Sequence, residues 1–232
     1  MDYECRAISL LCHKYGEGAV IAKVFTEELG LKSFSIKRSG GRKSKNKLSL
    51  LESQFLININ GKNNKKKQIQ YLNEINLAYA FQDNTFKKKL IRTFISEILS
   101  KTLVDSEKNK ELFEFVWKTN ISIDQAKKIG DAFCLEFMVQ LTYYLGIYPS
   151  TENIHYDFFN INNGIFTNKE VPGELNLKGI NLKYLKKIIK KEEVSIPSEN
   201  RRELIENVFD YFTCHHYNLS NIKSYNVILS LE

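Results

Sequence analysis

The chain has 232 residues, of which 43% are hydrophobic and 26% are charged. These fractions are typical of soluble globular proteins and exclude a wholly disordered, collagen-like or mucin-like chain. The length corresponds to one large domain or two modest ones. The 34 Lys and Arg residues exceed the 27 Asp and Glu residues, which gives a formal net charge of +7.

The excess positive charge lies entirely in the first third of the chain. Residues 1–81 hold 14 basic and 7 acidic side chains, whereas residues 82–232 hold 20 of each. A basic segment joined to a neutral one is typical of a polyanion-binding module with an attached scaffold. From charge alone, nucleic acid and an anionic membrane surface are both candidate partners.

Membrane insertion and export are not predicted. The most apolar stretch, 132–148, has 17 residues and contains Glu136 and Gln140, so it predicts a buried helix rather than the roughly 20 apolar residues of a membrane span. The acidic start of the chain does not match a signal peptide. The four cysteines are far apart and form no Cys-x-x-Cys pair, which predicts reduced thiols in a cytosolic protein.

The first 80 residues predict five short strands separated by turns. Apolar and β-branched residues mark strands at 5–12, 19–25, 31–37 and 55–60, and a last strand runs through Ile69 and Tyr71. Asn60 and Gly61 are expected to open a turn before the last strand. Five strands in so short a segment, with longer loops after the third and fourth, predict an OB-fold barrel over residues 1–81.

From Phe86 onward the apolar spacing becomes helical. Helices are predicted at 86–103, capped by Asp83 or Asn84, around 112–117, and from Asp124 to about Leu145. A short hairpin is predicted around Asn162–Gly164, followed by helices at 182–191, 199–216 and 222–231. The predicted fold class is therefore α+β: an N-terminal five-stranded OB-fold barrel packed on an all-helical C-terminal domain, 82–232, with a hairpin insertion near 150–175.

Two lysine-rich segments of the predicted barrel are the strongest functional signal. Gly and Ser residues alternate with the cations of the first segment, so backbone N–H groups and hydroxyls can approach phosphates closely. Lys and Arg release condensed counterions when they bind phosphates. Both segments are expected to border one face of the barrel, although two merely solvated loops are the alternative. The predicted DNA-binding residues are Lys32, Lys37, Arg38, Arg42, Lys43, Lys45, Lys47, Lys62, Lys65, Lys66 and Lys67.

Aromatic residues of the barrel are assigned to its core at this stage. Phe25, Phe34, Phe55 and Tyr71 each fall within a strand pattern, and Tyr15 lies in a turn. No residue is therefore nominated to stack on nucleobases.

Four further cations, Lys87, Lys88, Lys89 and Arg92, lie in the first turns of the helix that begins at Phe86. Positive charge at a helix N-terminus opposes the helix dipole. We interpret these residues as an extension of the DNA-binding surface onto the second domain or, equally, as a solvated helix face.

No catalytic residue, metal ligand or cofactor site is predicted. Cys214, His215 and His216 are consecutive on a helix, where neighbouring side chains diverge by about 100°, so a packed helix end is the simpler interpretation. The sequence contains no phosphate-binding Gly-x-x-x-x-Gly-Lys-Ser/Thr loop and no His-Glu-x-x-His motif.

Several short motifs resemble the RecO family of bacterial recombination mediators. They are Tyr15-Gly16-Glu17, the segment from Phe25 to Leu31, the basic segment from Gly40 to Lys45, Leu145-Gly146-Ile147-Tyr148-Pro149, and Lys223-Ser224. Their order and spacing cover nearly the whole chain and agree with a barrel followed by helices.

The resemblance implies a non-enzymatic DNA repair factor of the bacterial cytoplasm, associated with the nucleoid. Such proteins bind single- and double-stranded DNA, anneal complementary strands and help to load recombinase. Their partners are RecR and the C-terminal tail of single-strand-binding protein. The chain departs from the family pattern at two places. Residues 150–175 contain no cysteine where many members carry a four-cysteine zinc site, which predicts no zinc, and Tyr225 follows Lys223-Ser224 where Arg is common.

Two alternative functions are considered beside the mediator. One is a non-catalytic OB-fold adaptor whose neutral helical domain docks an acidic peptide tail of a partner. The other, a nuclease or other nucleic-acid enzyme, has no motif in the sequence to support it.

Overall fold

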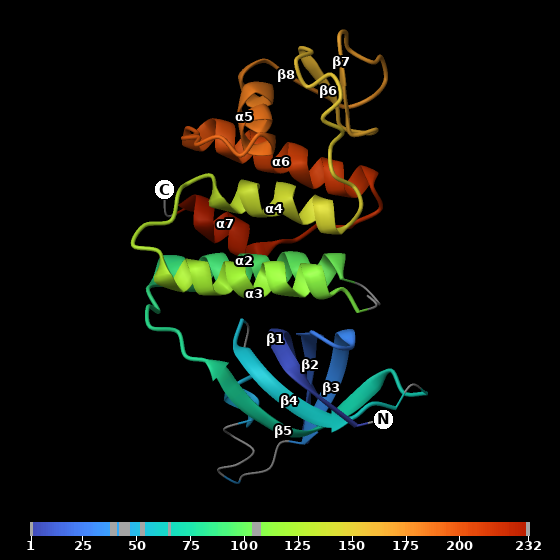
Figure 1. The fold of residues 1–232 in the computed structure, drawn as a ribbon, viewed down its shortest axis with the longest axis vertical. Coiled ribbons are helices and arrows are strands. Elements are labelled where there is room, and N and C mark those ends of the chain that lie inside the picture. Colours follow the sequence, from blue (N-terminus) through green and yellow to red (C-terminus); the bar gives the residue numbers. More distant parts are fainter. Residues whose placement is uncertain are drawn as a thin grey trace. The chain divides into compact units, whose positions relative to one another are not determined.

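The computed structural model describes residues 2–37, 41, 47–51, 54–64, 66–103 and 108–230. The chain forms two compact units, Met1–Ala126 and Lys127–Glu232. The first contains a β-barrel and helices α2 and α3, and the second contains α4 to α7 with a small sheet (Figure 1). The units divide at a later residue than the domain boundary expected after residue 81, because α2 packs on β1 of the barrel.

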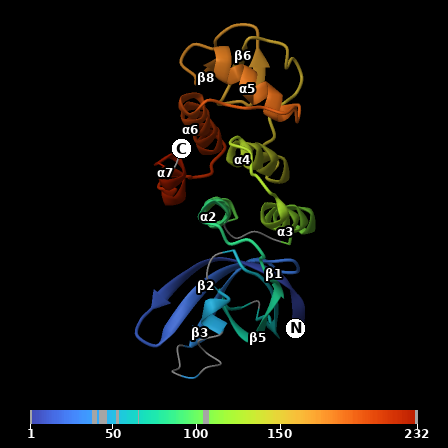
Figure 2. The ribbon, with the colours of Figure 1, turned by 90° about the vertical axis from the view of Figure 1, so that its left-hand side faces the viewer.

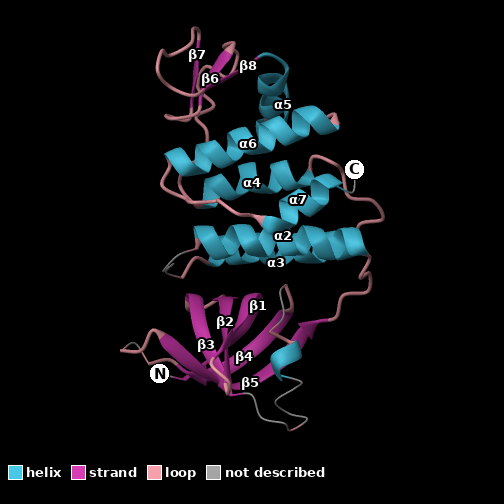
Figure 3. Ribbon diagram, turned by 180° about the vertical axis from the view of Figure 1, so that it is seen from behind, coloured by secondary structure: helices cyan, strands magenta, loops and turns pink. Residues whose placement is uncertain are grey.

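The barrel consists of five strands that close in the order β1-β2-β3-β5-β4. The pairing of β3 with β5 is parallel and every other pairing is antiparallel. Figure 3 shows these strands in magenta. The five-stranded OB-fold barrel predicted from the sequence is therefore confirmed. The strands are β1 (Asp2–Tyr15), β2 (Ala19–Thr26), β3 (Gly30–Lys37), β4 (Leu56–Lys62) and β5 (Ile69–Tyr79).

An irregularity in β1 lets this long strand pair with two neighbours. Its first half pairs with β4 and its second half with β2, and the register shifts between Ser9 and Leu11. Such bulges bend a strand and leave backbone groups unpaired. Here the carbonyl of Ser9 accepts the N–H of Gln54 at 2.7 Å, and the carbonyl of Leu10 accepts the hydroxyl of Ser96 at 2.5 Å. Because Ser96 belongs to α2, the bulge also attaches this helix to the barrel.

Gly61 continues β4 instead of opening a turn, which corrects the expectation for Asn60-Gly61. The strand ends one residue later, at Lys62. A Cβ atom on Gly61 would lie 2.6 Å from the hydroxyl oxygen of Tyr3 and 3.0 Å from the carbonyl oxygen of Tyr71. Only glycine therefore allows β1, β4 and β5 to approach so closely at this point.

Helices α2 (Phe86–Thr102) and α3 (Lys110–Gln125) lie side by side across one end of the barrel (Figures 1 and 2). The N-cap of α2 is Thr85 rather than Asp83 or Asn84. The carboxylate of Asp83 instead accepts the N–H of Thr85 at 3.0 Å. On α3, Phe113 packs against Phe25 of β2 with 5.5 Å between ring centroids.

Asp124 lies in the last turn of α3, so the single helix predicted from Asp124 to Leu145 is wrong. The helical pattern is interrupted between Gln125 and Phe133, and α4 spans Phe133–Tyr144. The carboxylate of Asp124 accepts the backbone N–H groups of Gln82 and Asp83, both at 3.0 Å. Long-range hydrogen bonds to Asp124 thus fix the end of α3, which the local apolar pattern did not indicate.

The second unit contains the predicted hairpin as part of a three-stranded sheet, whose third strand, β8, was not predicted. The strands are β6 (Phe158–Asn160), β7 (Ile165–Thr167) and β8 (Asn176–Lys178), in the order β7-β6-β8. The side chain of Glu174 accepts amide protons of Asn160 at 2.6 Å and Asn163 at 3.0 Å. The remaining helices are α5 (Gly179–Ile189), α6 (Ser198–Cys214) and α7 (Lys223–Ser230).

Candidate nucleic-acid interface

The described residues between β4 and β5 present lysines to solvent on a hydrogen-bonded backbone. Lys62, Lys66 and Lys67 are exposed. The side chain of Gln70, which is only 3% exposed, accepts the N–H of Asn64 at 2.9 Å and donates to the carbonyls of Asn64 at 2.9 Å and Lys67 at 2.5 Å. The buried amide of Gln70 therefore ties the backbone of Asn64 and Lys67 to β5.

Tyr71 on β5 is exposed, which corrects its assignment to the core. Its side chain is 57% exposed, and the Lys67 ammonium lies 5.7 Å from the ring centroid. The register of β5 explains this position. Residues 74 and 72 pair with consecutive residues of β4, so Asn73 forms a bulge. The extra residue reverses the order of inward-facing and outward-facing side chains along β5. Tyr71 therefore points outward, although Ile75, an even number of residues further along, points into the barrel.

Cross-strand partners place further polar side chains around Tyr71. Lys62 on β4 and Ser35 on β3 are its direct register partners, and side chains of such partners lie on one face of a sheet. Lys37 follows Ser35 by two residues and is exposed on the same face of β3. We call the set Ser35, Lys37, Lys62, Lys67 and Tyr71 the outer face of the barrel.

Lys32 and Lys47 do not belong to this outer face. Lys32 lies two residues before Phe34 on β3, so the two side chains are on the same face of the strand, and Lys32 is only partly exposed. Lys47 donates a hydrogen bond to the carbonyl of Asn73 at 2.5 Å. That carbonyl belongs to the bulge in β5, so the ammonium of Lys47 stabilises the backbone irregularity that turns Tyr71 outward.

Sequence reasoning missed Lys23, which extends the outer face onto β2. It pairs with Ser33 of β3 and is partly exposed. The alternation of buried Val20, Ala22 and Val24 was the signal that could have placed it outside. The other predicted DNA-binding residues, Arg38, Arg42, Lys43, Lys45 and Lys65, lie outside the described residues.

Two of the four cations on α2 are buried, in conflict with a direct role in binding DNA. Lys88 pairs with Asp83 at 2.8 Å and donates to the carbonyl of Asp124 at 2.7 Å. Arg92 lies 3.3 Å from the Asp124 carboxylate, and its guanidinium stacks 3.7 Å from the ring centroid of Phe81. These residues join the end of the barrel to α2 and α3. Of the four, only Lys87 and Lys89 are exposed.

The pKa values of both Arg92 and Asp124 are lowered in this network, for different reasons. Burial lowers the pKa of Arg92, against the charges of Asp124 and Asp83 that raise it. Burial also opposes ionisation of Asp124. Hydrogen bonds from the backbone of Asp83 and Gln82 and from the hydroxyl of Tyr79, together with the Arg92 charge, outweigh burial and lower the pKa of Asp124. The carboxylate is therefore ionised and structural at neutral pH.

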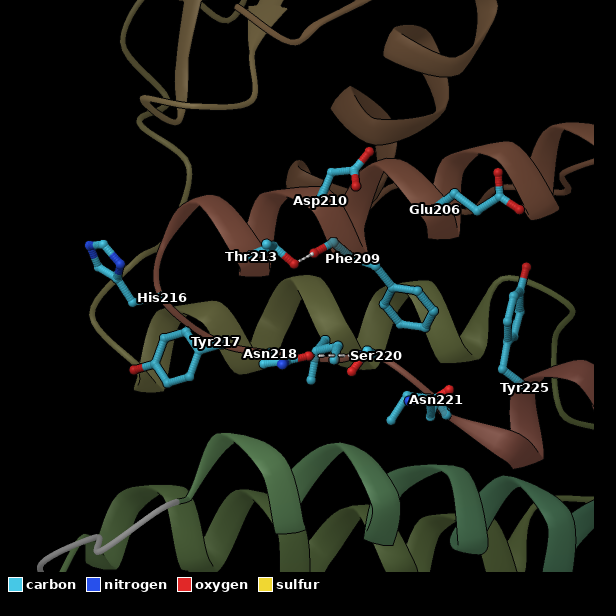
Figure 4. Close-up of a pocket in the computed structure, with 12 residues that line it drawn as sticks. Glu206, Phe209, Asp210, Thr213, His216, Tyr217, Asn218, Ser220, Asn221 and Tyr225 are labelled. Carbon is cyan, nitrogen blue, oxygen red and sulfur yellow. Dashed lines mark hydrogen bonds between the residues drawn. The ribbon is translucent and has the colours of Figure 1, made fainter.

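The second unit has an open cleft of about 690 Å³ beside α6 (Figure 4). Glu206 and Asp210, one helical turn apart, border it together with Phe209 and Tyr225, whose rings meet edge to face at 5.7 Å. The Phe209 ring points toward the segment that carries Ser220 and Asn221, whereas the Asp210 side chain points away from that segment. Carboxylates at the border of the cleft disfavour an acidic peptide as its ligand.

Helix α6 ends at Cys214, with His215 as its C-cap residue and His216 exposed beyond it, so the three residues are not consecutive on a helix as expected from the sequence. His215 Nδ1 lies 2.9 Å from the carbonyl oxygen of Tyr211, and the two rings are 4.3 Å apart. Within the described ranges, no three His, Cys, Asp or Glu side chains are grouped closely enough to hold a metal ion. In the same part of the chain, no helix combines the length and the apolar character that a membrane span requires.

Comparison with known proteins relates the whole chain to one group of repair proteins. Residues 1–81 match the family model of the recombination protein O N terminal domain, and residues 84–225 match that of its C terminal domain. The chain is 27% identical to the DNA repair protein RecO of Flavobacterium psychrophilum and 27% identical to that of Flavobacterium johnsoniae. Each alignment covers 98% of both chains. It is 24% identical to the DNA repair protein RecO of Azobacteroides pseudotrichonymphae, over 100% of this chain and 99% of the relative.

Proposed function

Because the chain belongs to the RecO family of DNA repair proteins, we propose that it is a recombination mediator that binds single- and double-stranded DNA and anneals complementary strands. In this proposal it also assists recombinase loading together with RecR on DNA coated by single-strand-binding protein. It acts in the bacterial cytoplasm at the nucleoid. Family membership and the chemistry of the barrel surface support this function.

The observation that carries the proposal is the exposed Tyr71 among the cations of the outer face. An aromatic ring accepts a stacked base of any sequence, and ammonium groups beside it bind the phosphates. Lys62, Lys67 and Lys37 surround the ring through register pairing and loop geometry. This combination fits a single strand whose bases face the sheet.

The proposed activity is non-enzymatic and requires positioning rather than covalent chemistry. Two DNA strands repel each other through their phosphates, so annealing is faster when a protein neutralises part of that charge. Lysines of the outer face neutralise phosphates, and Tyr71 holds a base against the sheet while its Watson–Crick edge remains available for pairing. Gln70 keeps the loop in place, which reduces the conformational entropy lost on binding.

The test compares two triple variants of the full chain in DNA binding and annealing. One carries Lys62→Gln, Lys66→Gln and Lys67→Gln. The matched control removes the same charge from α2 and α3 by Lys101→Gln, Lys110→Gln and Lys118→Gln. We expect the first variant to bind a fluorescent single strand more weakly, with a salt dependence about two units shallower on a log–log plot, at about 0.7 per phosphate contact. Equal affinity and annealing in both variants would contradict the proposal.

The alternative function, an adaptor that docks an acidic peptide tail in the helical region, gains no support from the cleft of the second unit. The carboxylates of Glu206 and Asp210 border that cleft, and like charges at a binding site weaken association.

A further inference from the structure

The second unit holds 12 basic and 13 acidic residues, a net charge of −1, but contains a segregated cluster of lysines. Six of the 12 Lys and Arg residues in 127–232 lie within residues 178–191, a segment without Asp or Glu. This segment covers α5, drawn in orange in Figure 1. Glu192 and Glu193 directly follow this segment, and the other acidic residues lie elsewhere in the unit, so a count over the whole region conceals the cluster.

Two of these six lysines have structural roles. Lys178 pairs with Glu170 at 2.6 Å, and Lys186 donates to the carbonyl of Tyr156 and lies over the ring of Phe166. The remaining four are exposed and form no ion pair with any described residue: Lys183, Lys187, Lys190 and Lys191.

The exposed lysines alternate with apolar side chains along one face of α5. Positions 180, 183, 184 and 187 follow the helical repeat of three and four residues. Ile180 is 50% exposed and Tyr184 is partly exposed. The opposite face is buried through Leu182 and Leu185. We call the set Ile180, Lys183, Tyr184, Lys187, Lys190 and Lys191 the α5 stripe.

A lysine follows the end of α5 at a position where glycine is usual, and it adds a further positive charge there. Lys191 follows the C-cap residue Lys190 and has φ +57°. The N–H of Lys191 donates to the carbonyl of Ile188 at 3.0 Å, and the N–H of Glu192 donates to that of Lys187 at 2.9 Å. Helices commonly end in this way with glycine in the left-handed conformation. A lysine here accepts backbone strain, which points to a role for its charge.

Like charges lie close together within the cluster. Burial lowers the pKa of the Lys186 ammonium group, and of its charged neighbours Asp157 raises this pKa whereas Lys190 lowers it. Lysines four residues apart, such as Lys183 and Lys187, also repel each other on a helix. A bound polyanion would relieve this repulsion.

We propose that the α5 stripe is a second binding surface for single-stranded nucleic acid, which holds one strand while the outer face of the barrel holds another. The inference rests on the proposed annealing function and names the site of the second strand. Lys183, Lys187, Lys190 and Lys191 bind phosphates, and Tyr184 and Ile180 contact bases.

An acidic peptide with an apolar end is a poorer match than a nucleic-acid strand. Such a peptide requires an apolar pocket beside the cations. The cavity beneath α5, lined by Leu185, Leu204 and Tyr211 among others, has a volume of about 20 Å³, close to that of one water molecule. A phosphate backbone requires only correctly spaced cations, which the α5 stripe provides.

The test uses a full-chain variant that carries Lys183→Gln, Lys187→Gln and Lys191→Gly. The glycine removes a charge and also relieves the left-handed backbone, so the helix end is expected to be at least as stable as in the natural chain. The matched control carries Lys127→Gln, Lys128→Gln and Lys169→Gln, three exposed lysines of the same unit outside α5. Circular dichroism and thermal unfolding verify that both variants fold.

The readouts are fluorescence annealing of two complementary oligonucleotides and energy transfer between two differently labelled, non-complementary oligonucleotides on one protein. We expect the α5 variant to bind a first strand like the control but to anneal about ten-fold more slowly and to show no energy transfer. Annealing and energy transfer equal to the control would refute the inference. Weaker binding of a labelled acidic peptide with unchanged annealing would also refute it, in favour of a peptide site.

The barrel variant distinguishes failure of this inference from failure of the proposed function. If Lys62→Gln, Lys66→Gln and Lys67→Gln abolish strand binding while the α5 variant anneals normally, the function stands and only the second surface is wrong. If neither triple variant affects DNA binding, the proposed function itself fails.

Discussion

Replacement of Asp124 by Asn is expected to destabilise the first compact unit strongly. The Asp124 carboxylate accepts hydrogen bonds from the hydroxyl of Tyr79 and the N–H groups of Gln82 and Asp83, each at 3.0 Å, and lies 3.3 Å from Arg92. An amide has one acceptor oxygen instead of two and places an NH₂ group near these donors. It also removes the carboxylate that pairs with Arg92, which is only 3% exposed.

The size of the effect follows from the burial of this ion pair. Removal of one partner of a buried pair costs about 3–5 kcal/mol, because the other charge remains desolvated. Domains have a total stability of about 5–15 kcal/mol. With a urea dependence of about 2 kcal/mol per molar, the midpoint of unfolding should fall by about 2 M.

Tryptophan fluorescence measures this unit selectively. Trp117 is the single tryptophan of the chain, and it lies buried on α3 against Phe113 with 5.6 Å between ring centroids. Urea titrations of the natural chain and the Asp124→Asn variant therefore report unfolding of the barrel and its two helices. Glu111→Gln, an exposed acid in the first turn of α3, is the control and should change stability by less than about 1 kcal/mol.

The pH dependence tests the electrostatic origin of the effect. The pKa of Asp124 is lower in the folded chain than the unfolded value of about 3.9. A lowered pKa means that the stabilisation is complete above the unfolded value and is lost as the pH falls through the folded value. The difference between the natural chain and the variant should therefore shrink below about pH 4. A midpoint shift under about 0.5 M at pH 7, or a difference independent of pH, would refute the reasoning.

Three further predictions concern the barrel. Tyr71→Ala should weaken single-strand binding by about 1–3 kcal/mol without changing its salt dependence. Tyr71→Phe should retain the affinity, and equal losses of affinity in both variants would contradict a stacking role. Gly61→Ala should destabilise the barrel by about 1–3 kcal/mol, because its Cβ atom would lie 2.6 Å from the Tyr3 hydroxyl; an unchanged melting temperature would count against this close approach. The thiol of Cys5 has its pKa raised to about 11, mainly by burial, so it should resist alkylation at pH 8 until urea unfolds the barrel. Because Cys12 and Cys214 are free and only partly buried, the label is located by peptide mass spectrometry, and rapid labelling of Cys5 itself in the native chain would disprove its burial.

Patterns along the chain were enough to predict the class of fold and to locate the net charge. β-Branched and aromatic residues in 19–25 and the placement of Phe34 and Ile36 on one face of 31–37 predicted strands, and three- and four-residue spacing from Phe86 predicted α2, because all these patterns depend on neighbours along the chain. The confinement of the excess charge to the first 81 residues also required only counting. These features pointed to a barrel with a polyanion-binding surface.

Contacts between residues that are distant in sequence determine which charged and aromatic side chains reach the surface. A bulge at Asn73 turns Tyr71 outward, and Asp124, more than 30 residues away in sequence, draws Lys88 and Arg92 into the interior. Lys32 and Lys37 fall on opposite faces of one strand. Local sequence patterns do not predict the exposure of these side chains, because strand register and the partners of buried charges are set by residues that are distant in sequence.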